Sequence, residues 1–164
     1  MTIAPTLSAP SVDAGATLHN ILTHQVKVKV SSGTSKDARS MLDGSAETCW
    51  TSENVAPNSD ASCAVHVISF KLAHSISIAK LHTLALTFAG GFSPISLNIL
   101  ASEDGKVWSN VLERLFPIDT NARQFFHIQG LQDLQTSWLR FELQGSTDEY
   151  GRVIVYQAEM FATC

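Results

Sequence analysis

Short runs of alternating apolar and polar residues fill most of this chain, and they constrain the fold more than any other feature. The segment HQVKVKVSS, residues 24–32, alternates valine with lysine or glutamine, which predicts a half-buried strand with its lysines facing water. Further strands are expected over 63–72, 76–88, 95–100, 106–113, 123–129, 137–143 and 152–162. Only SKDARSML, residues 35–42, has a helical pattern, with Ser35 as its expected N-cap. Many short strands without intervening amphipathic helices predict an all-β, antiparallel jelly-roll sandwich.

Turn residues separate these runs. The pair Asp104-Gly105 stands between two runs of β-formers and is a strong hairpin signal, because Gly tolerates a positive φ. The tripeptide AHS, residues 73–75, is expected to be the turn between the strands over 63–72 and 76–88.

Length and composition predict one domain. A chain of 164 residues with 45% hydrophobic and 16% charged residues can bury a core of ordinary size. We expect residues 1–16, rich in Ala, Ser, Thr and Pro, to form a flexible leader, and residues 17–164 to form the sandwich domain. The net charge of −4 and the scattered Lys and Arg residues, apart from Lys27, Lys29 and Lys36, argue against a nucleic-acid partner.

The N-terminal region has no basic segment followed by an apolar one, and no apolar run is long enough to cross a membrane. Cys49, Cys63 and Cys164 are odd in number and lack metal-type spacing, so we expect free thiols, two of them buried. These features predict a cytoplasmic or nuclear protein.

No catalytic motif is present in the sequence. The six histidines lack HxH or HExxH spacing, and there is no GxSxG turn, phosphate-binding glycine loop or distinctive pair of carboxylates. The chain is therefore expected not to be an enzyme. Trp50, Trp108 and Trp138 each lie within an apolar strand-like segment, which favours packing in the core over a stacking platform for sugars or bases.

Several motifs carry a family resemblance through their order. MLDGSAETCWTS, SEDGKVW, SWLRFEL and QAEMFA follow one another as they do in the discoidin or coagulation-factor C-domain family, a galactose-binding-like group. The resemblance spans residues 25–163. More narrowly, ETCW, FAGGFS and DEYGRVIVY resemble small intracellular members that are nuclear-receptor-associated repressors. The family resemblance implies a discoidin-like sandwich, in which Asp104-Gly105 forms a hairpin and Trp108 packs back on the core.

The resemblance also implies a structural calcium site. Family members often bind calcium where an Asp-Gly loop meets a carboxylate of the last strand, and the matching residues here are Asp43, Thr48 and Glu159. Calcium prefers six to eight oxygen ligands, and backbone carbonyls would complete the set. Those carbonyls belong to Leu42, Ser45 and Ala158. The alternative is that Asp43 caps the turn and Glu159 hydrogen-bonds the loop amides without a metal.

Two stretches are candidates for a partner-binding surface. FAGGFSP, residues 88–94, presents Phe92 on a glycine turn, which can close a ligand groove or form a bulge. GSTDEYGRVIVY, residues 145–156, places charged and aromatic side chains on a loop, as recognition sites often do. These side chains are Asp148, Glu149, Tyr150 and Arg152. The alternative is that Arg152 pairs with a neighbouring carboxylate and Tyr150 covers the end of the sandwich.

Three functions follow from the resemblance. The first is a noncatalytic adaptor that binds another protein. The second is a carbohydrate-binding, lectin-like module, which requires an exposed ring such as Phe92 or Tyr150 near Arg152. The third is a discoidin-like subunit of a larger complex such as the intraflagellar transport train, which requires an apolar patch on a sheet. Family members outside the cell insert apolar loop tips into membranes, but the corresponding segment here, residues 31–40, is polar apart from Ala38. Membrane insertion is therefore not expected.

Overall fold

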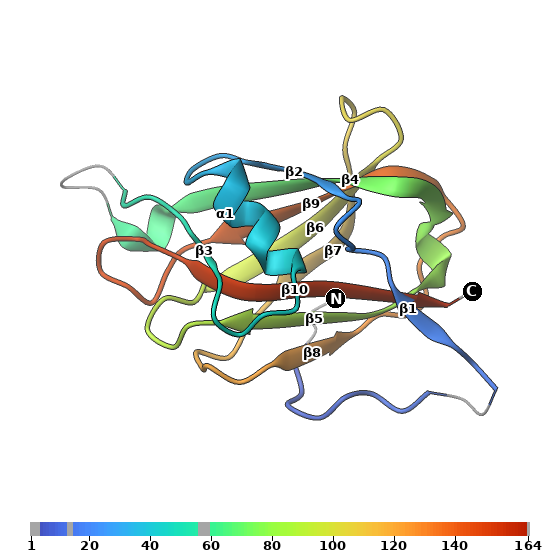
Figure 1. The fold of residues 1–164 in the computed structure, drawn as a ribbon, viewed down its shortest axis with the longest axis horizontal. Coiled ribbons are helices and arrows are strands. Elements are labelled where there is room, and N and C mark those ends of the chain that lie inside the picture. The colour runs from blue at the N-terminus through green and yellow to red at the C-terminus, as the bar shows by residue number, and fades with distance from the viewer. Residues whose placement is uncertain (1–3, 13–14, 56–59, 164) are drawn as a thin grey trace.

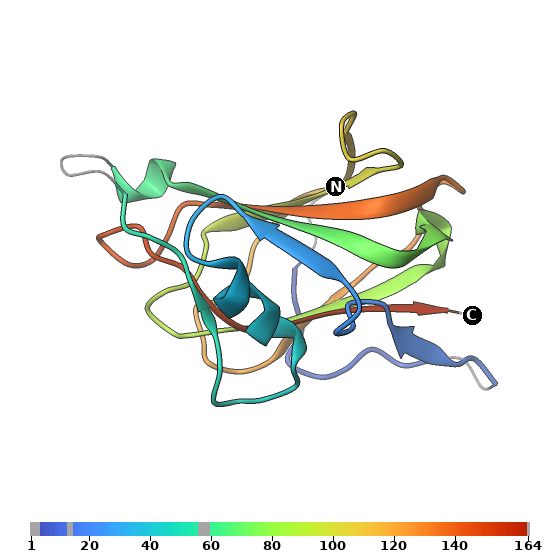
Figure 2. The same ribbon diagram turned by 45° about the horizontal axis from the view of Figure 1, so that its top comes forward.

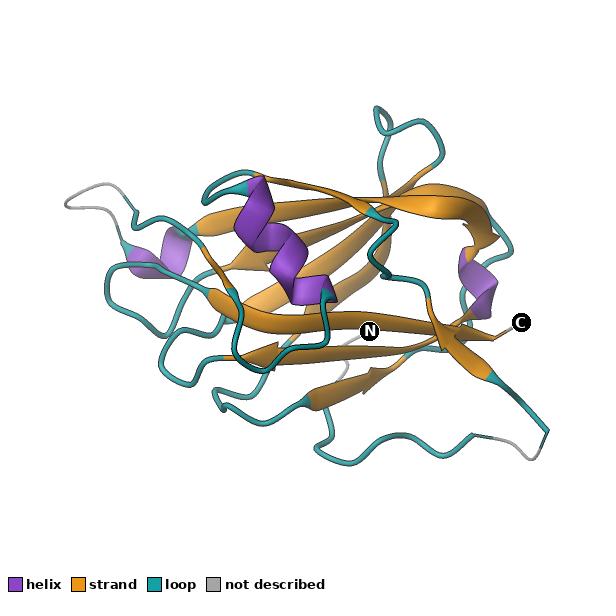
Figure 3. Ribbon diagram, in the orientation of Figure 1, coloured by secondary structure: helices purple, strands orange, loops and turns teal. Residues whose placement is uncertain are grey.

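The protein is an antiparallel β-sandwich of two five-stranded sheets, seen in a computed structural model that describes residues 4–12, 15–55 and 60–163 (Figures 1 and 3). Sheet A has the order β2-β4-β9-β6-β7, with bounds Lys27–Val30, Val65–Ser77, Gln135–Gln144, Ser96–Ser102 and Ser109–Leu115. Sheet B has the order β1-β10-β5-β8, with bounds Leu18–Asn20, Ile154–Thr163, Leu81–Phe88 and Gln124–His127. Strand β3 (Trp50–Thr51) pairs with β10. The predicted fold class, an antiparallel jelly-roll sandwich, is confirmed.

Short helices close the gaps between the sheets. Helix α1 (Ser35–Arg39) and the 3-10 helix η1 (Ser40–Leu42) lie across the opening between β2 and β10 (Figures 1 and 2). They bury Ala38 and Met41 completely in the core. The N-cap is Thr34, whose hydroxyl accepts a hydrogen bond from the Asp37 amide at 3.1 Å, so the prediction of Ser35 was wrong by one residue. Two further 3-10 helices are η2 (Ala61–Cys63) and η3 (Ile78–Lys80).

The boundary predicted at residues 73–75 is also wrong. These residues lie inside β4, where the register with β9 shifts between Lys71 and Ile76. The chain instead turns into β5 through η3. Long strands often carry such an irregularity, and it mimics a turn in the sequence because it breaks the two-residue alternation.

The core lies between the sheets and is built from alternate residues of each strand. Phe70 of β4 and Phe141 of β9 meet edge to face, with ring centroids 4.9 Å apart. Trp50 is also fully buried, as expected. Trp108 and Trp138, however, are half-buried. Trp138 faces the outer side of sheet A, because its neighbour Leu139 points inward, and Trp108 packs edge to face on Trp138. The predictions that these two tryptophans pack in the core are therefore wrong.

The hairpin tip between β6 and β7 packs on Trp138. The Asp104 carboxylate accepts hydrogen bonds from the amides of Lys106 and Val107, at 2.8 and 3.0 Å. Gly105 has a φ of +77°, and a Cβ there would lie 2.7 Å from a ring carbon of Trp138. Glycine is required at this position both by its φ and by the close approach of the ring.

The first described residues contact the edge of sheet B. Thr6 and Phe125 exchange two backbone hydrogen bonds of 2.8 Å, an isolated antiparallel bridge beside β8. Cys49 is half-buried and Cys63 is exposed, and both are free thiols. The prediction of two buried cysteines is therefore wrong; Cys164 lies outside the described residues. No helix within 4–12, 15–55 and 60–163 is long and apolar enough to cross a membrane.

Candidate functional site

Three loops meet at the end of the sandwich that lies opposite the C-terminus (Figure 1). They are residues 89–95 after β5, 116–123 between β7 and β8, and 145–153 between β9 and β10. The Thr147 amide donates to the Ser93 carbonyl at 2.9 Å, and the Ile154 amide donates to the Phe92 carbonyl at 3.0 Å. Backbone pairing therefore holds the two predicted partner-binding stretches side by side.

Arg152 joins these stretches through its side chain. Its guanidinium carbon lies 5.1 Å from the centroid of the Phe92 ring, and its Nε lies 3.2 Å from Oδ2 of Asp148. The same Asp148 oxygen accepts the Arg152 amide at 3.1 Å. Pairing of Arg152 with a neighbouring carboxylate was the alternative to partner binding expected from the sequence, and this ion pair is present. It holds the guanidinium against the Phe92 ring.

Tyr150 and Glu149 of the predicted stretch are open to solvent. Tyr150 is 56% exposed, so it does not cover the end of the sandwich. Glu149 is exposed, and no cation of the described part of the chain pairs with it. We call Phe92, Asp148, Glu149, Tyr150 and Arg152 the loop site. It combines a fixed cation on an aromatic ring with an exposed tyrosine and an exposed carboxylate.

Asp119 bonds both loops that carry the loop site, and sequence reasoning missed it. One of its oxygens, Oδ1, accepts from the Gly91 amide at 2.8 Å and the Ser93 hydroxyl at 2.9 Å. The Thr147 hydroxyl also donates to that oxygen, at 3.4 Å. The amide oxygen of Asn121 accepts from the Gly90 amide at 2.6 Å. The sequence signal was the turn-forming triplet Asp-Thr-Asn, which predicts a loop but not which loops it joins.

The predicted calcium loop forms a closed hydrogen-bonded turn. Asp43 accepts from the Ser45 amide at 2.8 Å and from the Thr48 hydroxyl at 2.6 Å. Desolvation is the largest single influence on Asp43 and raises its pKa. The hydrogen bonds from Thr48, Ser45 and Gln157 together outweigh it, so the pKa of Asp43 lies below its ordinary value. The Asx-type turn of the alternative interpretation is present.

Gln157, which was not predicted, takes the place assigned to Glu159. Its Nε2 donates to the Ser45 carbonyl at 2.7 Å and approaches Oδ1 of Asp43 at 3.4 Å, and its Oε1 accepts the Gly44 amide at 3.2 Å. Glu159 instead forms two hydrogen bonds with Arg123, at 3.0 and 2.9 Å. Both residues lie on the outer side of β10, but Gln157 is nearer the loop.

These residues do not fit a calcium ion well. The Gln157 amide group donates hydrogen bonds to the two oxygens that would have to face a cation, one from Asp43 and one from the Ser45 carbonyl. Leu42 ends η1, and Ala158 is a core residue paired with Leu86 of β5. Within the described residues, no three His, Cys, Asp or Glu side chains are grouped as metal ligands. The calcium site expected from the sequence therefore gains no support from these residues, and Glu159, one of its predicted ligands, is bonded elsewhere.

His66 connects two more loops at the same end. Its Nε2 lies 2.8 Å from the Gly151 carbonyl, and because a carbonyl can only accept, that nitrogen is the donor. Nδ1 forms a hydrogen bond with the Ser32 hydroxyl at 3.2 Å, and the Ser32 oxygen accepts the Glu53 amide at 3.1 Å. His66 is only 5% exposed, and both nitrogens are bonded. The serine and histidine therefore hold the loops together.

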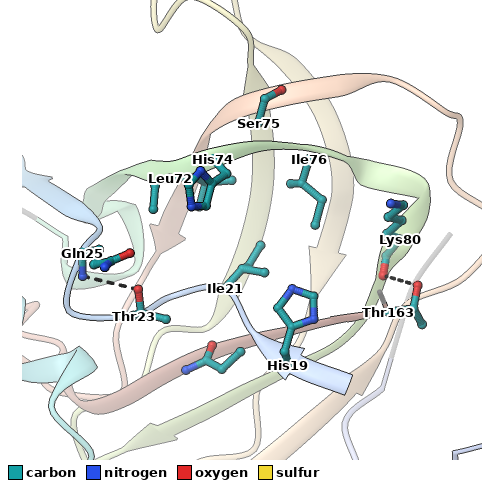
Figure 4. Close-up of a pocket in the computed structure, with 12 residues that line it drawn as sticks. His19, Ile21, Thr23, Gln25, Leu72, His74, Ser75, Ile76, Lys80 and Thr163 are labelled. Carbon is teal, nitrogen blue, oxygen red and sulfur yellow. Dashed lines mark hydrogen bonds between the residues drawn. The ribbon is translucent and has the colours of Figure 1, made fainter. Parts of the chain in front are cut away.

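A cavity of about 290 Å³ lies at the opposite end, under the connection from β1 to β2 (Figure 4). Ile21, Leu72 and Ile76 form its apolar part, and His19, His74 and Lys80 stand around it (Figure 4). None of the residues predicted from the sequence lies there. Residues 72–76, at the shift of register in β4, line this space, and the sequence pattern did not indicate it.

The sequence is similar to a group of proteins that all have the same name. A Xenopus laevis protein named nuclear receptor 2C2-associated protein is 28% identical over 147 residues, which are 86% of this chain and 96% of that protein. The Danio rerio protein of the same name is also 28% identical, over 146 residues that cover 86% of this chain and 94% of that protein. No protein-family model matches the chain.

The fold is similar to carbohydrate-binding modules. CpGH89CBM32-5 from Clostridium perfringens, solved with GalNAc-β-1,3-galactose, has a TM-score of 0.67 and 14% identity over 88% of this chain and 100% of its own. The family 32 module of C. perfringens NanJ, solved with galactose, has a TM-score of 0.66 and 16% identity over 88% and 99%. The chain therefore has the galactose-binding-like β-sandwich fold, and its sequence resembles nuclear receptor 2C2-associated proteins.

Proposed function

We propose that this protein is a noncatalytic, intracellular adaptor that binds another protein through the loop site, acting in the cytoplasm or nucleus. The observation that carries the proposal is the arrangement of Arg152, held on Phe92 by Asp148, beside the exposed Tyr150. Arginine and tyrosine contribute disproportionately to protein interfaces, and a preorganised guanidinium loses little entropy when a partner binds. The names of the similar proteins support a partner of the nuclear-receptor class.

The rigidity of the loop site also supports binding. Asp119 ties together the 89–95 and 145–153 loops, and His66 bonds the Gly151 carbonyl from the other side. Loops that are fixed on a sandwich present the same surface to every partner molecule, so less binding free energy is spent on ordering them.

Carbohydrate binding is the second candidate. Sugar sites commonly pair an exposed aromatic ring with polar side chains, and Tyr150 and Arg152 offer such a pair. The structural neighbours that were solved with sugars have the same fold, but fold likeness is weak evidence for a ligand. We rank this candidate second because the Phe92 ring, the other aromatic of the loop site, is half-buried with Arg152 over it.

The test is a binding measurement with purified nuclear receptor 2C2. The variant Tyr150→Ala/Arg152→Ala should lose at least about tenfold in affinity, because interface tyrosine and arginine side chains often contribute 2 kcal/mol or more each. The matched control, Leu134→Ala/Lys80→Ala, removes one exposed apolar side chain and one exposed cation outside the loop site and should bind as the unchanged protein does. Thermal melting of both variants establishes that they are folded.

Two results would contradict the proposal. One is equal affinity of the receptor for the folded loop-site variant and for the unchanged protein. The other is no receptor binding together with retention on a GalNAc-β-1,3-galactose resin that free galactose reverses. That second pattern would establish the carbohydrate-binding function instead.

A further inference from the structure

The outer side of sheet A carries a group of cations on neighbouring strands. One cross-strand row contains Lys27, Lys71 and Trp138, and the next contains Lys29, Ser69 and Arg140. Their intervening neighbours Val28 and Phe70 point into the core, so these rows face outward. Lys27, Lys29 and Lys71 are exposed, and Arg140 is half-buried. We call Lys27, Lys29, Lys71 and Arg140 the basic face.

Within the described residues, none of the four cations of the basic face forms an ion pair. The ion pairs of these residues are Arg123–Glu159 and Arg152–Asp148, and the outward-facing Glu142 beside Arg140 belongs to neither. Lys27 lies directly opposite Lys71 in the β2–β4 register. Like charges directly opposite each other on adjacent strands destabilise a sheet. The arrangement is therefore unfavourable for the isolated protein and becomes favourable when an anionic partner is present.

Two of the four cations, Arg140 and Lys71, lie over tryptophan rings. The Arg140 guanidinium carbon lies 4.0 Å from the centroid of Trp108, and Lys71 Nζ lies 5.8 Å from that of Trp138. The two rings pack edge to face at 6.4 Å. Arg140 Nε also donates to the Ser69 hydroxyl at 3.3 Å. Each tryptophan ring thus holds a cationic side chain over its face, since the π-electrons of the ring attract a cation.

We propose that the basic face binds an acidic, extended segment of a protein partner, an inference that rests on the proposed adaptor function. Cations on neighbouring strands are separated by about 4.8 Å, and alternate residues of one strand by about 6.7 Å. An extended peptide has the second spacing between its alternate side chains. Glutamate or aspartate side chains at alternate positions can therefore meet Lys27 and Lys29. Carboxylates at the intervening positions, which project to the other side of the peptide backbone, can reach Lys71 and Arg140.

Nucleic acid fits this face less well than an acidic peptide. Single-stranded nucleic acid binds on aromatic rings with open faces, whereas Arg140 and Lys71 stand over the rings here. Glu142 also faces outward on the row next to Arg140, and the chain as a whole has a net charge of −4. A phosphate backbone extending beyond the four cations would meet negative charge, while a short acidic segment would not. The face is also basic rather than apolar, so it gives no support to the transport-complex alternative.

The test compares binding of a short fluorescent polyglutamate peptide, a neutral polyglutamine peptide and an oligothymidylate of equal length at low salt. The unchanged protein should bind polyglutamate best, and added salt should weaken that binding. Lys27→Gln/Lys71→Gln should lower the polyglutamate affinity by roughly three- to tenfold. The control Lys36→Gln/Lys80→Gln removes two exposed lysines elsewhere and should not change it.

A stability measurement on the same proteins distinguishes a binding surface from a structural one. Lys27→Gln alone removes a like-charge contact and, within the described residues, no ion pair or cation–ring contact, so its melting temperature at low salt should equal or exceed that of the unchanged protein. Lower stability together with weaker binding would assign the lysine a structural role and overturn the inference.

Other outcomes have distinct meanings. The inference is wrong if the unchanged protein does not bind polyglutamate, or if both double variants bind it equally. Tighter binding of oligothymidylate that is lost in Lys27→Gln/Lys71→Gln would replace the acidic peptide with single-stranded nucleic acid. If nuclear receptor 2C2 binds Lys27→Gln/Lys71→Gln as well as the unchanged protein but not the loop-site variant, the adaptor function stands and the basic face is not used.

Discussion

The outer sides of the two sheets each place an arginine over aromatic rings, but they differ in what neutralises its charge. On sheet B, Arg123 lies 4.8 Å from the Phe125 centroid and 5.8 Å from that of Phe161, and it forms two hydrogen bonds with Glu159. On sheet A, Arg140 lies over Trp108 and bonds only the neutral hydroxyl of Ser69. The arginine charge on sheet B is therefore neutralised by a carboxylate of the same protein, whereas the arginine charge on sheet A is left unpaired and is available to a partner.

Cross-strand register explains this difference. Ala85 of β5 lies between Phe125 of β8 and Glu159 of β10, and its small side chain leaves room for Arg123 to reach across to the carboxylate. The cross-strand neighbours of Arg140 are Ser69 and Leu100, which bring no carboxylate within reach. Glu142 lies in the row next to Arg140 without pairing with it, so an acidic residue in an adjacent row does not by itself neutralise an arginine.

The largest effect expected from altering these faces is on stability, from removal of a ring. Trp138→Ala should lower the free energy of unfolding by about 2 kcal/mol, because this half-buried ring supports the hairpin tip at Gly105 as well as Trp108. Phe161→Ala on sheet B is the matched variant and should cost less, because no hairpin rests on it. Denaturant unfolding measures both, and an equal loss would mean that the hairpin gains nothing from Trp138.

A smaller effect is expected for the ion pair on sheet B. A double-mutant cycle with Arg123→Ala and Glu159→Ala should give a coupling energy of about 0.5–1 kcal/mol, which is typical of a well-aligned but partly exposed pair. The coupling should fall in high salt. A coupling near zero at low salt would show that sheet B is no better satisfied than sheet A, and the contrast between the faces would disappear.

The turn over sheet A gives a pH-dependent prediction. The Val107 amide, then the Lys106 amide and then the Ser102 hydroxyl lower the pKa of Asp104, because all three donate to its charged form. A lowered folded-state pKa stabilises the protein above the ordinary Asp pKa, and that contribution is lost as pH falls through the lowered value. Asp104→Asn should therefore be less stable than the unchanged protein at neutral pH, with the difference shrinking on acidification. A difference that is constant with pH would show that the charge is irrelevant.

The smallest effect concerns calcium at the loop beside sheet B. Calcium and a chelator should give the same melting temperature, because Gln157 already fills the space between Asp43 and the Ser45 carbonyl. Gln157→Glu supplies a second carboxylate and should produce a calcium-dependent rise, since a ligand that binds only the folded state stabilises it. A rise in the unchanged protein would restore the calcium site expected from the sequence.

The strand pattern was predicted well because alternation is a local property. The run over 24–32 contains β2, and the runs over 95–100 and 137–143 cover most of β6 and β9, since each has core residues at every second position. Strands β1 and β3 were not predicted. Each has at most three residues, too few for a periodic signal, and pairing with β10 defines them.

The candidate site was predicted in part. Phe92 and Arg152 were identified separately from their loops, and the structure brings them together. Asp119 and Gln157 were missed, since polar residues at these positions have many local uses and only their distant partners reveal the role. The assignment of Glu159 to the calcium loop failed because Arg123, thirty-six residues away, engages it.

The sequence by itself determined the strand content, the hairpin at Asp104-Gly105 and the polar character of the 145–153 loop, because these depend on neighbouring residues. Only the tertiary structure decided that Trp108 and Trp138 lie outside the core and that Lys27 faces Lys71. It also decided that Glu159 is neutralised while Arg140 is not. These outcomes depend on the register between strands far apart in the chain, where a shift of one residue moves every side chain to the other face.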